Sequence, residues 1–198
     1  GEGDIFLGIT VPETRKIAKQ YAKLPLKQIK AHLSSKFHEE RLAALLILVS
    51  NYQKSKDKEI FDFYLNNTSN INNWDLVDLS AHQIIGDYLF DKDKSVLYNL
   101  AKSSNLWERR IAVISTFHFI KNSQFQVSLE ISKILLNDKH DLIHKAVGWM
   151  LREIGKRDKK VLEDFLSKYY KQMPRTMLRY SIEKFPENIR KQYLKGEI

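Results

Sequence analysis

A tryptophan and an aspartate at helical spacing are the first candidates for chemistry. Trp74 and Asp78 are four residues apart, which places them side by side on one helix face. Asn72 or Asn73 can cap this helix, and Asp75 in its first turn suits the helix dipole, whereas Asp78 lies beyond that turn. We consider two interpretations of Asp78: a functional carboxylate or an ordinary solvated one. The opposite face of the segment holds Leu76, Val77, Ser80, Ala81 and Ile84.

A second tryptophan stands beside two cations. At 100° per residue, Trp149, Arg152 and Lys156 fall on one side of a predicted helix. Such a face is typical of an aromatic surface with phosphate-binding cations beside it. The structural alternative is that Trp149 packs against a neighbouring helix or against the aliphatic stems of Arg152 and Lys156. The apolar arc of the same helix consists of Ala146, Val147, Met150, Leu151 and Ile154.

Arg110 lies in an apolar stripe, which a charged residue tolerates only with a partner or at a boundary with water. It shares its helix face with Val113, Ile114 and Phe117. The partner is either an internal acid, such as Glu108 or Asp78, or a phosphate. Arg110 is therefore a third candidate site residue.

Other chemistries find less support. The absence of Cys excludes disulfides, thiolate metal sites and thiol nucleophiles. His140 and His144 have i,i+4 spacing but no third ligand, which favours structural histidines, and we expect neither a metal nor another cofactor. The sequence also lacks a Gly-rich phosphate loop, a nucleophile elbow and a His-Glu-x-x-His motif. The number of lysines leaves a Schiff-base glycosylase open, although nothing marks any Lys as buried.

The elements that would position these residues are helices. Apolar residues recur at helical spacing along all 198 residues, and no stretch has the alternation of a strand. Short polar breaks separate the predicted helices, as at 66–70, 91–94, 102–105 and 137–138. The longest strongly apolar run, Leu42–Val49, is far shorter than the roughly 20 residues that span a bilayer. We expect a soluble all-α protein.

The helices repeat. Aligning short similar segments superposes Ala43, Val77, Ala112, Ala146 and Tyr180, at intervals of 34, 35, 34 and 34 residues. This period, with two helices per repeat, predicts an α-solenoid whose inner helices line one concave surface. The alternative is a chance resemblance among short helices.

The charge distribution favours a polyanionic partner. The chain has 33 Lys and Arg against 24 Asp and Glu, a net charge of +9. The net charge is +3 over residues 1–70, zero over 71–140 and +6 over 141–198. A basic C-terminal third is typical of a protein that contacts a phosphate backbone, although an incidental lysine-rich surface has the same composition.

Several segments together resemble the DNA alkylation repair enzymes, which are alkylpurine DNA glycosylases built from HEAT-like helical repeats. The resemblance lies in Asn73–Asp78, Leu106–Ala112 and Lys145–Glu153, and in the opening Phe6–Ile9 followed by Pro12–Arg15. These segments occur in the family's order and cover nearly the whole chain. The resemblance implies a solenoid of HEAT-like helical hairpins with a concave basic groove.

The resemblance also implies roles for individual residues. Asp78 would be the catalytic carboxylate, Trp74 and Trp149 would line the site around the modified nucleotide, and Arg110 would hold a backbone phosphate. Arg152 and Lys156 match positions expected to assist DNA binding. The activity that the resemblance implies needs no metal.

The implied activity is hydrolysis of the N-glycosidic bond of purines alkylated at N3 or N7, such as 3-methyladenine and 7-methylguanine, in duplex DNA. Asp78 would stabilise the oxocarbenium-like sugar and orient water. Two alternatives remain: a non-catalytic helical-repeat scaffold that binds protein or DNA, and a DNA-structure binder that has lost the chemistry. A metal-independent monofunctional glycosylase is the leading hypothesis.

The expected organisation is one HEAT-like domain over residues 1–198. The chain begins Gly1-Glu2-Gly3-Asp4, without an initiator Met or a signal-peptide pattern. Because further N-terminal helices normally precede the family's early motif, we expect a trimmed N-terminus that lacks some of them. We also expect a monomer in the cytoplasm of a bacterial-type cell, associated with the nucleoid through DNA and not with a membrane.

Overall fold

The computed structural model describes residues 3–198, so Gly1 and Glu2 of the expected N-terminus lie outside the described part. The regular elements of this part are helical, apart from an isolated bridge between Ile5 and Phe37, which confirms the all-α prediction. The chain forms two compact units, an N-terminal unit that ends at Lys92 and a C-terminal unit over Asp93–Ile198. One domain over residues 1–198 stays a prediction.

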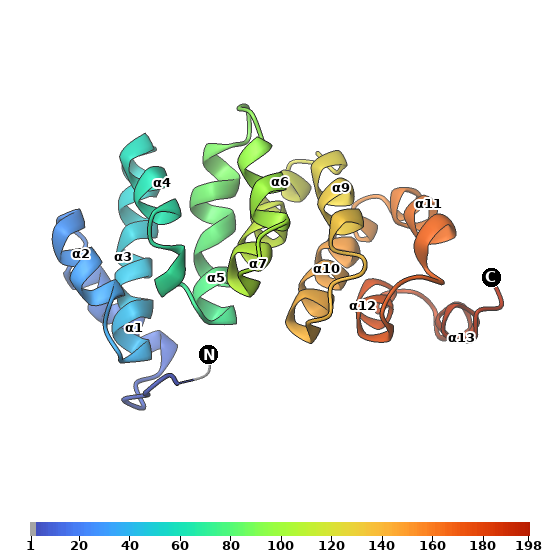
Figure 1. The fold of residues 1–198 in the computed structure, drawn as a ribbon, viewed down its shortest axis with the longest axis horizontal. Helices are drawn as coiled ribbons and strands as arrows, with labels where there is room; N and C mark the ends of the chain where they lie inside the picture. Colours follow the sequence, from blue (N-terminus) through green and yellow to red (C-terminus); the bar gives the residue numbers. More distant parts are fainter. Residues whose placement is uncertain (1–2) are drawn as a thin grey trace. The chain divides into compact units, whose positions relative to one another are not determined.

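The N-terminal unit is built around α3, the longest helix among the described residues. α1, α2 and α5 all pack against α3 (Figure 1). A π-helical turn, η2, directly continues α5 and contacts both α3 and α4. The elements are α1 (Val11–Gln20), α2 (Leu26–Leu33), α3 (His38–Ser55), α4 (Lys58–Leu65), the 3-10 turn η1 (Thr68–Asn70), α5 (Trp74–Ala81) and η2 (His82–Gly86).

The C-terminal unit is organised around α10, which packs against α7, α11 and α12 (Figure 1). The chain turns at Thr116 between α7 and α8, and α13 packs on α12. The elements are α6 (Ser95–Ala101), α7 (Leu106–Ser115), α8 (Phe117–Lys121), α9 (Gln126–Ile134), α10 (Asp141–Gly155), α11 (Lys159–Tyr169), α12 (Arg175–Ser181) and α13 (Glu187–Lys195).

The predicted repeats correspond to helical hairpins. Each aligned position lies on the second helix of a consecutive pair: Ala43 on α3, Val77 on α5, Ala112 on α7, Ala146 on α10 and Tyr180 on α12. The first helices of these pairs are α2, α4, α6, α9 and α11. The 34–35-residue period therefore corresponds to a repeat of two consecutive helices, as predicted.

Polar residues in the breaks determine where several helices begin. The side chains of Asp57, Asn73, Asn105 and Asp158 accept hydrogen bonds from backbone N–H groups at the starts of α4, α5, α7 and α11. These groups have no partner within their own helix, so a side-chain acceptor stabilises the helix start by about 1 kcal/mol. Asn73 is thus the cap of the helix that carries Trp74 and Asp78.

The apolar arcs predicted for α5 and α10 belong to the core. Each side chain assigned to the two arcs is buried. On α10, Gly148 lets α12 approach closely: a Cβ atom there would lie 2.6 Å from the carbonyl oxygen of Met177 and 2.5 Å from the Cβ of Tyr180. Burial of these arcs leaves the opposite faces of α5 and α10 accessible to solvent.

None of the helices among residues 3–198 combines the length and apolarity needed to span a bilayer.

Candidate nucleic-acid site

Trp74 and Asp78 lie on one face of α5, as the sequence predicts. The Trp74 side chain is conspicuously open to solvent, with 54% of the residue's surface exposed, and Asp78 is half-buried one turn later. The backbone N–H of Trp74 donates to the Asn73 side chain at 2.7 Å, which starts the helix at the tryptophan. α5 therefore presents an aromatic ring beside a carboxylate.

The Asp78 carboxylate lies near a buried phenol. Tyr64 of α4 is fully buried, and its Oη lies 2.9 Å from Ser80 Oγ. Burial raises the pKa of Tyr64 and the negative charge of Asp78 raises it further, against the hydrogen bond with Ser80, which lowers it. Tyr64 is therefore neutral at ordinary pH and supports α5 without adding charge beside Asp78.

Asp75 has a larger role than the helix dipole predicts. Its Oδ2 lies 2.7 Å from Nε2 of His38, the first residue of α3. The contact joins two elements 37 residues apart in sequence. No spacing rule within one helix could reveal it.

Arg110 is buried, with 5% of its surface exposed, and its Nη1 donates to the backbone carbonyl of Leu142 at 2.5 Å. Leu142 belongs to the first turn of α10, so the guanidinium links α7 to the start of the next inner helix. The sequence predicted an acid or a phosphate as partner, and the structure adds a backbone carbonyl.

Trp149 is half-buried and packs on Phe117, with ring centroids 5.7 Å apart and planes inclined by 45°. The structural alternative for this residue is therefore correct in part: the ring contacts a neighbouring helix and keeps part of its surface exposed. The contact with Phe117 restricts the orientation of the Trp149 ring and therefore of its exposed part.

Carboxylates hold the two predicted DNA-binding cations of α10. Arg152 forms an ion pair with Glu183, and Lys156 Nζ lies 2.6 Å from Oε1 of Glu153. Arg157 binds the second oxygen of Glu153 at 3.2 Å. Burial of Glu153 would raise its pKa, but the hydrogen bonds from Lys156 and Arg157 and the charges of Lys156 and Arg152 lower it below its ordinary value. Glu153 is thus the anionic centre of a cationic surface.

Sequence reasoning missed a second group of cations beside this cluster. Lys145, Arg179 and Arg190 line a hollow of about 510 Å³ between α10, α12 and α13, together with Tyr180. Lys145 binds Asp141 at 2.7 Å, whereas Arg179 and Arg190 form no ion pair with another described residue. Arg179 follows Lys145 by one 34-residue repeat, so the repeat register contained the signal that identifies it.

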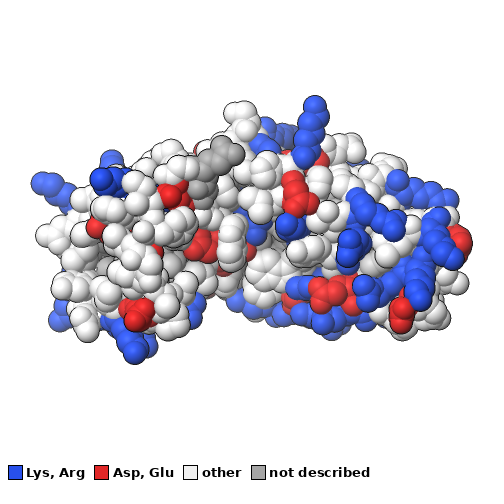
Figure 2. Space-filling model, turned by 90° about the horizontal axis from the view of Figure 1, so that it is seen from below, with Lys and Arg blue, Asp and Glu red and all other residues white. Residues whose placement is uncertain are grey.

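The basic surface continues around this unit. On the face drawn in Figure 2, Lys and Arg side chains gather over the C-terminal unit, with Asp and Glu between them. This distribution matches the net +6 of residues 141–198. The C-terminal unit therefore has a surface rich in cations, with carboxylates interspersed among them.

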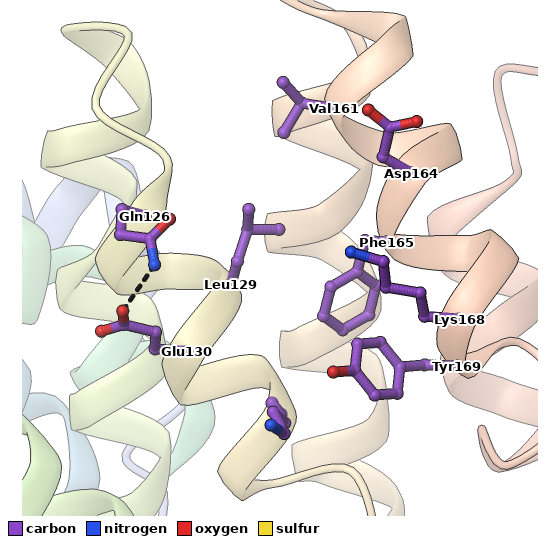
Figure 3. Close-up of a pocket in the computed structure, with 9 residues that line it drawn as sticks. Gln126, Leu129, Glu130, Val161, Asp164, Phe165, Lys168 and Tyr169 are labelled. Atoms are coloured by element: carbon purple, nitrogen blue, oxygen red, sulfur yellow. Dashed lines mark hydrogen bonds between the residues drawn. The ribbon is translucent and has the colours of Figure 1, made fainter.

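A hollow between α9 and α11 is a separate feature of the C-terminal unit. It has a volume of about 480 Å³, and Leu129 of α9 and Phe165 of α11 line its two sides (Figure 3). Gln126 donates to Glu130 at 2.5 Å along one wall, and Lys133 lies over the Tyr169 ring on the other side. The hollow contains none of the predicted site residues.

The two histidines considered as metal ligands have structural contacts. His140 accepts a hydrogen bond from the backbone N–H of Leu142 and begins α10, and His144 Nε2 lies 2.5 Å from the backbone oxygen of Asp138. Within residues 3–198, no group of three or more His, Asp or Glu residues is arranged to hold a metal ion.

The six predicted site residues fall into two sets. Trp74 and Asp78 belong to the N-terminal unit, and the other four belong to the C-terminal unit: Arg110, Trp149, Arg152 and Lys156. The second set lies on the inner helices α7 and α10 or at the end of α10. Convergence of both sets on one concave basic groove stays a prediction.

Comparison with known proteins identifies similar chains. A family model described as DNA alkylation repair enzyme matches residues 1–185. No match is found among curated proteins. A predicted DNA alkylation repair enzyme from Enterococcus faecalis has a similar solved structure, with a TM-score of 0.75, 19% identity and coverage of 93% of this chain and 90% of that chain.

Two further solved structures come from Streptococcus mutans. AlkD2 is 20% identical, with a TM-score of 0.65 and coverage of 91% of this chain and 92% of that one. The protein smu.31 of strain UA159 is 21% identical, with a TM-score of 0.60 and coverage of 94% and 90%. At these identities the likeness demonstrates a shared helical fold.

Proposed function

Because this chain belongs to the DNA alkylation repair enzyme family, we propose that it is a monofunctional alkylpurine DNA glycosylase acting on duplex DNA. The observation that carries the proposal is the pairing of an exposed Trp74 with Asp78 one turn later on α5. A helix with only a structural role gains no stability from an exposed tryptophan beside a carboxylate.

The chemistry needs only these groups and water. Alkylation at N3 or N7 makes the purine cationic, so the N-glycosidic bond breaks with its electron pair leaving on the base, which departs neutral. The deoxyribose then carries positive charge, and the Asp78 carboxylate stabilises it electrostatically. Water adds to C1′ and releases a proton to solvent. Trp74 and Trp149 offer aromatic faces to the cationic sugar or base, each worth about 0.5–2 kcal/mol.

The cations of the C-terminal unit would hold the flanking phosphates. Arg152 and Lys156 are joined in this role by Arg179 and Arg190, which form no ion pair with other described residues. Arg110 would reach a phosphate while keeping its hydrogen bond to Leu142, since a guanidinium has five donors. These contacts fix the position of the lesion relative to Asp78.

The direct test is release of free 7-methylguanine or 3-methyladenine from defined duplexes under single-turnover conditions. We expect Asp78→Asn to lower the rate by orders of magnitude, with DNA affinity within about twofold of wild type, because charge stabilisation is lost while phosphate contacts remain. Asp62→Asn is the matched control, since Asp62 is, like Asp78, a half-buried aspartate and is paired with Lys58 on α4. Wild-type release no faster than spontaneous depurination would refute the proposal.

One observation favours a second candidate, a DNA binder without glycosylase activity. Arg179 and Arg190, which form no ion pair with other described residues, lie in the C-terminal unit, whereas Asp78 lies in the N-terminal unit. In that case the protein binds DNA with a steep salt dependence, releases no base, and is indifferent to Asp78→Asn.

A further inference from the structure

A buried histidine joins the beginning of the chain to the candidate catalytic helix. His38 is 4% exposed and lies between two carboxylates. Its Nε2 is 2.7 Å from Oδ2 of Asp75, and its Nδ1 is 3.3 Å from Oδ2 of Asp4. One imidazole ring therefore touches both the N-terminal segment and the first turn of α5.

Asp4 is itself held from two sides. Arg41 Nη2 donates to its Oδ1 at 2.5 Å, and Asn73 Nδ2 donates to its Oδ2 at 2.7 Å. Burial would raise the pKa of Asp4, whereas the Asn73 hydrogen bond and the Arg41 charge lower it, so the carboxylate stays ionised. Asn73 also caps α5 through its side-chain oxygen. The cap residue is thus bound at both ends of its amide.

Backbone contacts hold the segment that follows Asp4 over the same ring. The buried Glu39 carboxylate accepts the N–H groups of Leu7 and Gly8 at 2.9 Å each, and the His38 N–H donates to Ile5 O at 2.9 Å. The Phe6 ring covers the imidazole with a centroid distance of 4.9 Å. The segment is therefore a fixed strap that keeps His38 out of water.

These contacts hold the first turn of α5, next to the candidate site residues. Asp75 is the neighbour of Trp74 and lies three residues before Asp78. A single helical turn behaves as a rigid body, so anchoring Asn73 and Asp75 fixes how far α5 is rotated about its axis and where it begins. We propose that His38 is a positioning residue that sets the orientation of Trp74 and Asp78 through Asp75, an inference that rests on the proposed glycosylase function.

The test combines a spectroscopic signal with kinetics. The chain has three tryptophans, so Trp107→Phe with Trp149→Phe leaves Trp74 as the sole tryptophan, whose fluorescence is excited at wavelengths that the nine tyrosines do not absorb. In that background we expect His38→Ala to lower the fluorescence anisotropy of Trp74, and His38→Gln, which keeps one donor toward Asp75, to restore most of it. His32→Ala is the matched control, because His32 is an exposed histidine on α2 beside Glu40.

Base release is measured with all three tryptophans intact. We expect His38→Ala to slow single-turnover release by roughly 10- to 100-fold, as small misplacements of reacting groups do, with affinity for undamaged duplex unchanged. His38→Gln should recover a large part of the rate. His32→Ala should match wild type in both measurements.

The outcomes separate the two proposals. If His38→Ala does not fold, Asp75→Asn tests the same contact from the other side and should give the same loss of Trp74 anisotropy and rate. Wild-type anisotropy in folded His38→Ala, or in Asp75→Asn where that replaces it, would overturn the positioning role. If the wild-type protein releases no base, the glycosylase proposal fails, while the Trp74 signal still decides whether His38 orients α5.

Discussion

Arg152 on α10 forms an ion pair with Glu183, two residues beyond the end of α12. The guanidinium predicted to contact DNA therefore has a carboxylate partner in the free protein. A phosphate that binds Arg152 must share it with Glu183 or displace it. We therefore expect the acid to weaken DNA binding by competition as well as by repulsion.

Removing this carboxylate should strengthen DNA binding. We expect Glu183→Gln to lower the Kd for undamaged duplex by about three- to tenfold at low salt, because a repulsive charge is lost and Arg152 is released. Fluorescence anisotropy of labelled DNA measures the change. Glu187→Gln, which removes an exposed glutamate paired with Lys191 on α13, controls for net charge. An equal gain in both variants would contradict a specific role for Glu183.

Arg179 and Arg190 should contribute to the salt dependence of binding. Each phosphate contact adds about one to the slope of log K against log salt, so Arg179→Ala and Arg190→Ala should each reduce that slope by about one. Lys160→Ala is the control, since Lys160 pairs with Asp164 on the surface of α11. Unchanged slopes would place DNA elsewhere on the molecule.

Arg110 should matter for folding as well as for DNA. Arg110→Ala leaves the Leu142 carbonyl without this donor, so we expect the free energy of unfolding to fall by about 1–3 kcal/mol. Urea denaturation measures the loss. An unchanged unfolding midpoint, together with weakened DNA binding, would assign Arg110 to phosphate contact alone.

Gly148 should resist substitution. In Gly148→Ala the new methyl group meets the Met177 carbonyl at 2.6 Å, so α12 must shift, at about 1–3 kcal/mol. Gly155→Ala meets the Leu162 side chain, which can change rotamer, and should cost less. Thermal unfolding of both variants checks the order. A smaller loss for Gly148→Ala would show that α10 and α12 separate easily.

Glu153 should make stability depend on acid. Lys156 and Arg157 lower its folded-state pKa below the ordinary 4.5, so its contribution is present above about pH 4.5 and is lost as pH falls through the folded value. Urea midpoints between pH 3 and 7 measure this loss. Glu153→Gln should be less stable than wild type at pH 7, and the difference should shrink toward pH 3. A constant difference would contradict the linkage.

Local rules account for much of the fold. Periodic apolar residues identified the buried arcs of α5 and α10, and the 34–35-residue register identified the second helix of each hairpin. A cap at Asn72 or Asn73 is predictable because an N-cap interaction involves residues adjacent in sequence, and Asn73 is the one that forms it. The exposed face that joins Trp74 to Asp78 follows from the same geometry.

Such local rules could not predict the partners of the charged residues. Asp75 binds His38 across 37 residues, Arg110 reaches Leu142 across 32, and Arg152 reaches Glu183 across 31. Each contact joins groups of different helices or of the segment that follows one, and the sequence offers several cations and acids for each partner.

The sequence by itself determined that this chain is a repeated array of amphipathic helices with Trp74, Asp78, Arg110 and Trp149 at particular helix positions, because helical periodicity acts over a few residues. Only the tertiary structure decided that Arg110 is buried on a carbonyl, that Glu183 holds Arg152, and that His38 anchors α5. Those outcomes depend on which helices pack together and on the high cost of leaving a buried charge without a partner.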